Sequence, residues 1–275
     1  MPLNYVSDHR ISPERQYRPE TSGLRVLQVA VSGTAMRTSV RELARSPQDA
    51  VPCDRLLNYF SPMPLSQSPT LFLPGWGFSG QVLELAEKRY LWARPAIPLD
   101  PVIALSEIMA FLAAHHLGSI HLVGWSMGAS LALDFTAAFP GQVATLTLLG
   151  LRSSWPPSEI SAIRQAITAD SATFLRDFYR KSLLGYKKEA RQFVAEQQET
   201  LLKSLEMEAL LRGLDYLSQW HLPAQMPQCP VFCWHGRRDI IAPVMERAII
   251  PGACATIIEH GGHALFLDRG LVLGA

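Results

Sequence analysis

The sequence predicts an α/β fold: a doubly wound, mostly parallel sheet with a helical insertion. Short apolar segments rich in β-branched residues alternate with segments whose apolar residues recur at helical spacing. One long stretch near the middle is charged and lacks strand-like alternation. The chain has 275 residues, a usual size for one such domain with an insertion, and 48% of them are hydrophobic, which suffices for a sizeable core.

The elements become clear from Thr70 onwards. Apolar segments bounded by turn residues predict strands at 70–73, 89–94, 119–123, 143–149, 230–234 and 255–259. Helical spacing predicts helices at 80–89, at 105–116 and from Ser126 to about Phe139, where Pro140-Gly141 follows. We therefore expect a core built from residues 70–154 and 223–275, with residues 155–222 as a helical cap.

Residues 1–69 form a divergent N-terminal lead. Residues 1–22 are polar and contain three prolines, which predicts irregular structure. Within the lead, the segment 24–31 reads LRVLQVAV and predicts a strand, and residues 38–44 are suited to a short helix. Residues 46–69 contain five prolines and little periodicity, and no element is assigned to them.

The composition excludes several classes of protein. Lys and Arg total 25 against 24 Asp and Glu, which gives no general reason for nucleic-acid or membrane binding. The four cysteines match neither a zinc site nor a dense disulfide framework. Cys229 and Cys233 flank an apolar run, so we expect these two to be small core residues in a reducing compartment. The start of the chain lacks the apolar core of a signal peptide. We expect a cytoplasmic monomer with neither a metal nor an organic cofactor.

The sequence Gly124-Trp125-Ser126-Met127-Gly128 matches G-x-S-x-G. In this motif the serine stands at the apex of a sharp turn from strand to helix, so its hydroxyl is exposed and the glycines leave room for neighbouring elements. The motif recurs by chance, but here it lies between an apolar strand and an apolar helix. Ser126 is therefore the candidate nucleophile; the alternative is a tight turn that simply requires small residues.

A serine nucleophile needs a base and an acid. His263 follows the last expected strand, and histidine is the residue type best suited to accept and return a proton near neutral pH. Asp239 follows the strand at 230–234, and the chain order serine, aspartate, histidine is one of the known triad orders. His260 is a less favoured base, and His235 is better explained as a turn or packed residue.

The loop Leu73-Pro74-Gly75-Trp76-Gly77 follows the first core strand. In the expected fold this loop and the residue after the nucleophile supply backbone N–H groups to the oxyanion, which makes Trp76 and Met127 the candidate donors. Trp76 and Trp125 flank the expected site, either as part of an acyl pocket or as core residues. Phe178 in the cap is a further pocket candidate.

These motifs resemble the α/β-hydrolases, and more narrowly the pimeloyl-acyl-carrier-protein methyl ester esterases of biotin synthesis. The resemblance covers about residues 70–268 and includes the segments 73–77, 124–128, 174–178, 191–192, 212–217, 239–243 and 262–264. The chain departs from that family in having Pro74 where relatives have His, in residues 94–101, and in ending twelve residues after His263 without a closing helix.

The resemblance implies an esterase that cleaves the methyl ester of a pimeloyl chain held on an acidic acyl carrier protein. It also implies that Arg176 and Arg191 contact the carrier. Other cap cations lie nearby in the sequence, at positions 180, 181, 187 and 188. The alternative for this cluster is an ordinary solvated helix face. Two other functions stay open: a general short-chain carboxylesterase, and a non-catalytic hydrolase-fold protein that binds a small ligand.

Overall fold

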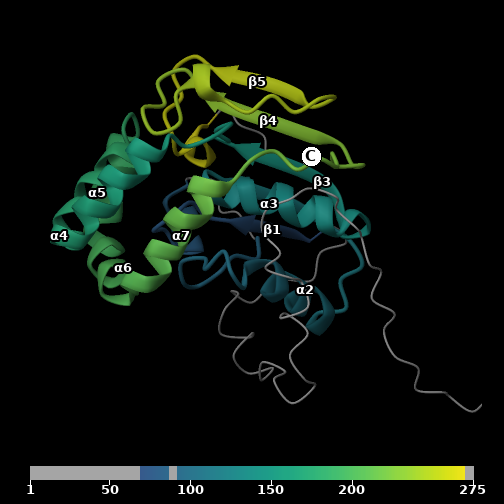
Figure 1. Ribbon diagram of the computed structural model, residues 1–275, viewed down its shortest axis with the longest axis horizontal. Coiled ribbons are helices and arrows are strands. Elements are labelled where there is room, and N and C mark those ends of the chain that lie inside the picture. Colours follow the sequence, from purple (N-terminus) through teal and green to yellow (C-terminus); the bar gives the residue numbers. More distant parts are fainter. Residues whose placement is uncertain (1–68, 87–91, 270–275) are drawn as a thin grey trace, which may run out of the picture. The chain divides into compact units, whose positions relative to one another are not determined.

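A computed structural model of the chain describes residues 69–86 and 92–269 (Figure 1). The strand expected at 24–31, the helix expected at 38–44 and Cys53 lie outside these residues. The remaining cysteines, Cys229, Cys233 and Cys254, form no disulfide; the first two are partly buried, and Cys254 is exposed. Cys229 and Cys233, expected in the core, thus lie at its margin.

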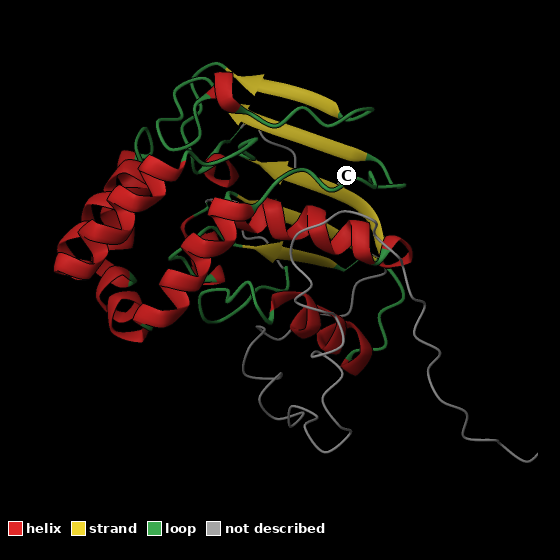
Figure 2. Cartoon of the chain, viewed as in Figure 1, coloured by secondary structure: helices red, strands yellow, loops and turns green. Residues whose placement is uncertain are grey.

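The core is a parallel sheet in which all strand neighbours are consecutive in the chain, in the order β1-β2-β3-β4-β5. Figure 2 shows the strands side by side, with their arrowheads toward the cap helices. The strands are β1 (Thr70–Leu73), β2 (Ile120–Trp125), β3 (Val143–Leu149), β4 (Val231–Gly236) and β5 (Cys254–Ile258). Because the carboxyl ends of parallel strands meet at one edge, the loops that follow them converge there.

Of the strand expected at 89–94 the structure describes residues 92–94, and Ala93 forms a parallel bridge with Leu71 of β1. The backbone of Ala93 exchanges two hydrogen bonds with β1, each of 2.9 Å. Pro95 follows two residues later and has no N–H group, so it cannot continue the ladder as a donor.

Two helices of the core follow the sequence pattern closely: α2 (Ala104–Ala114) and α3 (Met127–Ala138). Most of α3 is buried, with small residues such as Ala129 and Ala132, and it packs against β1, β2 and β3. The helix expected at 80–89 is instead a short 3₁₀ helix, η3 (Gly80–Leu85), which stops because Ala86 has an extended backbone. Further 3₁₀ turns are η4 (Pro140–Gln142), η5 (Val244–Glu246) and η6 (Leu265–Leu267).

Between β3 and β4 the chain forms a group of helices, called the cap from here on. It consists of α4 (Pro157–Ser182), α5 (Lys187–Glu196), α6 (Gln198–Ser204) and α7 (Met207–Gln219). Asp170 kinks α4, with φ −156° and ψ 90°, and its carboxylate accepts the N–H of Thr173 and so caps the second half. Among the described helices none is both long and apolar enough to cross a membrane.

Candidate active site

Ser126 lies at the turn between β2 and α3, at the carboxyl edge of the sheet. Its backbone has φ 56° and ψ −122°, an uncommon conformation for a residue with a side chain. The turn is fixed on both sides: Ser126 N–H donates to the carbonyl of Leu149 at 2.8 Å, and its own carbonyl accepts the N–H of Ala129 at 2.9 Å. The sharp turn expected from the motif is therefore present.

The two glycines of the motif allow neighbouring backbones to approach. A Cβ atom at Gly128 would overlap the carbonyl oxygens of Leu73 and Pro74, and one at Gly124 would overlap the first turn of α3. Any side chain at either position would therefore push α3 away from the strands that hold Ser126.

His263 and Asp239 form a buried pair. The Nδ1 of His263 lies 2.8 Å from Oδ2 of Asp239, and the two residues are only 2% and 5% exposed. The other carboxylate oxygen accepts the backbone N–H groups of Ile241 at 2.9 Å and Ala242 at 2.8 Å. Burial alone would raise the pKa of Asp239, but the attraction and hydrogen bond of His263, together with these N–H groups, lower it below 3.8. Asp239 is thus an anion that can orient an imidazole.

Trp125 connects this pair to the serine turn. Its indole N–H donates to the carbonyl of His263 at 2.9 Å, and the two rings lie 5.3 Å apart. Since Trp125 directly precedes Ser126, the bond holds the histidine loop beside the serine. Gly150, at the end of β3, leaves the space that the pair needs, because a Cβ atom there would lie 3.3 Å from His263 Nδ1.

The other two histidines near the site have separate surroundings. His260 Nε2 lies 3.1 Å from the buried carboxylate of Asp268, and its side chain is 73% exposed. His235 is buried at the end of β4, and burial lowers its pKa from the ordinary 6.5 to about 4, so it is neutral at pH 7. Neither His260 nor His235 takes part in the hydrogen bond between His263 and Asp239.

The candidate oxyanion loop lies directly against Ser126. A Cβ atom at Gly75 would lie 3.2 Å from Cβ of Ser126. The loop forms a turn in which Phe78 N–H donates to the Gly75 carbonyl at 3.1 Å, with Gly77 at φ 71° in the third position. Trp76 occupies the second position. Met127 is the first residue of α3, where a backbone N–H has no acceptor within the helix.

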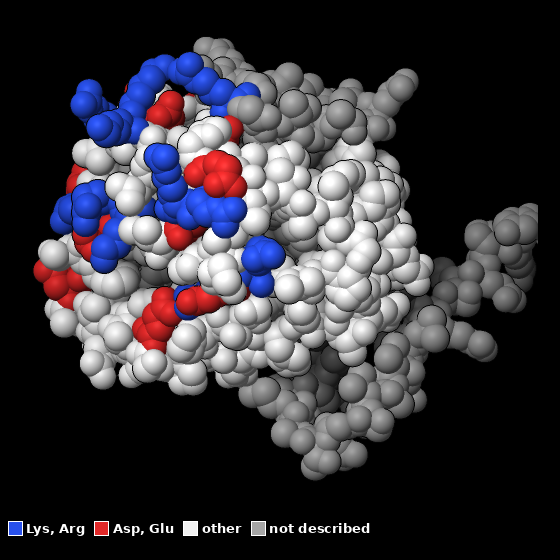
Figure 3. Space-filling model, turned by 90° about the horizontal axis from the view of Figure 1, so that it is seen from above, with Lys and Arg blue, Asp and Glu red and all other residues white. Residues whose placement is uncertain are grey.

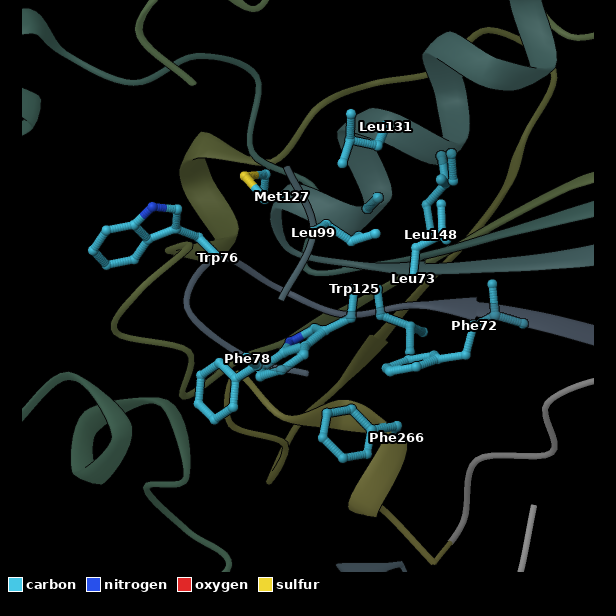
Figure 4. Close-up of a cluster of buried hydrophobic side chains, with 14 of the residues drawn as sticks. Phe72, Leu73, Trp76, Phe78, Leu99, Trp125, Met127, Leu131, Leu148 and Phe266 are labelled. Carbon is cyan, nitrogen blue, oxygen red and sulfur yellow. The ribbon is translucent and has the colours of Figure 1, made fainter. Parts of the chain in front are cut away.

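Aromatic side chains surround the loop on the cap side. Trp76 packs edge-on against Phe174 and Phe178, with ring centroids 6.4 and 5.3 Å away. Trp76 is 5% exposed, whereas Trp125 is fully buried and packs between Phe78 and Phe266, as Figure 4 shows. Trp125 therefore has the surroundings of a core residue, while Trp76 and the partly exposed Phe178 remain the pocket candidates.

Of the two candidate carrier contacts, Arg176 is already paired. Its guanidinium donates to both carboxylate oxygens of Glu199, at 3.0 and 3.2 Å, across the surface of the cap. Arg191 is exposed on α5. The Arg176 guanidinium would have to leave Glu199 to bind an acidic partner, whereas Arg191 is exposed to solvent.

Sequence reasoning gave no role to Arg152, which follows β3 by three residues. Arg152 is 5% exposed, forms ion pairs with Glu159 of α4 and Glu246 of η5, and stacks on Trp155 at 4.4 Å. It therefore ties the start of the cap to the segment that follows Asp239. Its partner Glu246 is distant in the sequence, so no local pattern could have indicated the contact.

Residues 70–274 match the alpha/beta hydrolase family, and the chain belongs to that family. It is 27% identical over 235 residues to the pimeloyl-[acyl-carrier protein] methyl ester esterase of Chromobacterium violaceum, covering 74% of this chain and 91% of the relative. The protein of the same name from Methylococcus capsulatus is 33% identical over 179 residues, covering 54% and 65%. The predicted fold class and family resemblance are confirmed.

Solved structures agree on the fold. An esterase from Exiguobacterium antarcticum superimposes with a TM-score of 0.62 at 18% identity, covering 74% of this chain and 88% of that one. A bromoperoxidase from Bacillus anthracis gives a TM-score of 0.65 at 15% identity, covering 75% and 88%. The esterase and the bromoperoxidase have different activities on one fold, so the fold alone does not identify the activity of this chain.

Proposed function

We propose that the protein is a serine carboxylesterase with Ser126 as nucleophile, His263 as general base and acid, and Asp239 as the group that orients His263. The observation that carries the proposal is the buried pair of His263 and Asp239, 2.8 Å apart, which Trp125 holds beside the serine turn. A buried anion on Nδ1 fixes the tautomer that leaves Nε2 free to accept the serine proton.

In the first half-reaction, Ser126 Oγ attacks the ester carbonyl and its proton passes to Nε2 of His263. The carbonyl oxygen becomes an oxyanion that accepts hydrogen bonds from the backbone N–H groups of Trp76 and Met127. The tetrahedral intermediate collapses, and His263 returns the proton to the departing alcohol. An acyl group is then bonded to Ser126 Oγ.

In the second half-reaction, His263 removes a proton from water, and the resulting hydroxide attacks the acyl carbonyl. The same backbone N–H groups stabilise the second oxyanion. When this intermediate collapses, the carboxylic acid leaves and His263 returns the proton to Ser126 Oγ. The net reaction converts one ester and one water to one acid and one alcohol.

The substrate that we propose is a methyl ester of an acyl chain carried on an acyl carrier protein, as named for the relatives from Chromobacterium and Methylococcus. The aromatic residues Trp76, Phe174 and Phe178 offer an apolar wall for such a chain. On the face in Figure 3, Lys and Arg gather toward the side where α4 and α5 lie, mixed with acids. A cation there attracts an acidic carrier, and an internal partner such as Glu199 weakens that attraction.

The test is a side-by-side assay of pimeloyl methyl ester on acyl carrier protein and p-nitrophenyl butyrate, with Ser126→Ala as the blank. We expect hydrolysis of both, with a kcat/KM for the carrier-bound ester at least about 10-fold higher. Arg191→Glu should lower kcat/KM for the carrier-bound ester alone, most at low salt. Lys203→Glu, a charge reversal on α6, is the control. Equal kcat/KM for both substrates would contradict the carrier assignment and favour a general short-chain carboxylesterase.

A non-catalytic ligand-binding protein is the alternative from another class. A fluorophosphonate reacts only with an activated serine, so it distinguishes the two. The esterase proposal expects labelling that Ser126→Ala abolishes. Folded wild-type protein that takes no label would favour the binding protein.

A further inference from the structure

Two buried hydrogen bonds run from the cap to the candidate oxyanion loop. The indole N–H of Trp76 donates to the carbonyl of Leu210 on α7 at 2.9 Å. The hydroxyl of Tyr179 on α4 donates to the carbonyl of Gly77, also at 2.9 Å. Trp76 and Gly77 are the two central residues of the loop's turn, so each is held by a different helix of the cap.

Close packing reinforces the contact with α7. Gly213 lies three residues after Leu210, on the same face of the helix. A Cβ atom at Gly213 would lie 2.5 Å from Cδ1 and 2.7 Å from Nε1 of Trp76, and 3.5 Å from Sδ of Met127. The indole therefore lies directly on the helix backbone, and a side chain at position 213 would meet the side chains of both candidate oxyanion donors.

The contact with α4 acts on the backbone itself. The Gly77 carbonyl that Tyr179 binds belongs to a residue at φ 71°, one position after Trp76. A turn with its third residue in this region has a defined orientation of its central peptide groups. If the carbonyl of Gly77 is released, the turn can rotate, and the N–H of Trp76 rotates with it.

We propose that the cap positions the oxyanion donor: Tyr179 and Gly213 are positioning residues that fix the direction of the Trp76 backbone N–H. This inference rests on the proposed esterase function and deepens it. Phe174 and Phe178 pack on the same indole, so an acyl chain bound against these rings would lie next to the group that the cap holds. The cap then affects the chemical step as well as the choice of acyl chain.

The test compares Tyr179→Phe and Gly213→Ala with matched controls. Tyr216→Phe also removes a hydroxyl that bonds cap to core, at Asp134 of α3, away from the loop. Gly118→Ala adds a methyl group where nothing lies within 4 Å. For each variant we would measure kcat and KM for p-nitrophenyl butyrate, the inhibition constant of a trifluoromethyl ketone with the same acyl chain, and the melting temperature.

We expect Tyr179→Phe and Gly213→Ala to lower kcat by about 10- to 100-fold with KM changed less than about threefold. The trifluoromethyl ketone, whose hemiketal oxygen is an oxyanion, should bind more weakly by a similar factor, while both controls keep wild-type kcat. A merely structural role would lower the melting temperature without this loss of inhibitor binding. Wild-type kcat and inhibition in both test variants would overturn the inference and leave the esterase intact. A wild-type protein that hydrolyses no ester would overturn the proposed function and the inference together.

Discussion

Replacement of Asp239 by Asn perturbs the site with little change in shape. In the wild type, one carboxylate oxygen accepts two backbone N–H groups and the other faces Nδ1 of His263. An Asn side chain keeps its oxygen toward the two backbone donors, since the opposite orientation would place N–H against N–H. Its NH₂ group then faces Nδ1, which must act as an acceptor. The proton of the imidazole moves to Nε2, where it blocks acceptance of the serine proton.

The size of the effect follows from these contacts. The variant retains the two backbone hydrogen bonds and the packing, so the free energy of unfolding should fall by no more than about 1–3 kcal/mol. The base, in contrast, is held in the wrong tautomer and loses the anion that stabilises its charged form. Such a change lowers kcat by about 10⁴-fold, or about 5 kcal/mol of transition-state stabilisation.

The assay is steady-state hydrolysis of p-nitrophenyl butyrate at pH 7.5, together with chemical unfolding of each variant. Asp268→Asn is the matched control, because Asp268 is also a buried acid bonded to a histidine, the exposed His260. We expect the control to keep kcat within about threefold. An Asp239→Asn protein that is folded and retains more than a tenth of wild-type kcat would refute the tautomer argument.

Three further predictions concern stability. His235 has a pKa of about 4 in the folded protein and 6.5 in the unfolded chain, so between these pH values only the unfolded chain binds the proton. The contribution of neutral His235 to the free energy of unfolding is therefore fully present above pH 6.5 and falls by about 3 kcal/mol toward pH 4. Urea unfolding at pH 4.5 and 7 should show that the unfolding free energy of His235→Asn falls less between these pH values than that of the wild type. An equal fall in both proteins would contradict the low pKa of His235. Gly128→Ala should cost about 1–3 kcal/mol or more and abolish activity, while Gly141→Ala, in open space, should change the unfolding free energy by less than about 0.5 kcal/mol. Tyr216→Phe removes a donor from the partly buried Asp134 and should lower the unfolding free energy by about 1–2 kcal/mol. An unchanged urea midpoint would show that this bond is not stabilising.

Much of the sheet was predictable because β1, β2 and β3 are largely buried and read as apolar runs. Val143–Leu149, for example, has the bounds that its sequence suggested. In the segment expected as a strand at 89–94, residues 92–94 are described, and Ala93 among them pairs in parallel with Leu71 of β1.

The serine turn was predictable because a local motif encodes it, and the buried pair because each member follows a strand that ends at the same edge. The contacts that hold these residues were not. The bond from Trp125 to the carbonyl of His263 joins residues 138 positions apart, and that from Trp76 to Leu210 joins residues 134 apart. Such contacts depend on how the cap and the histidine loop dock, which the local pattern does not contain.

The central claim is that Ser126 carries the acyl group during ester hydrolysis. The most direct measurement is mass spectrometry of the protein after rapid mixing with p-nitrophenyl butyrate and acid quenching. The account predicts a butyryl adduct on the peptide that contains Ser126, and none in Ser126→Ala. An active enzyme whose adduct lies on another residue, or a Ser126→Ala variant that still hydrolyses the ester, would contradict it.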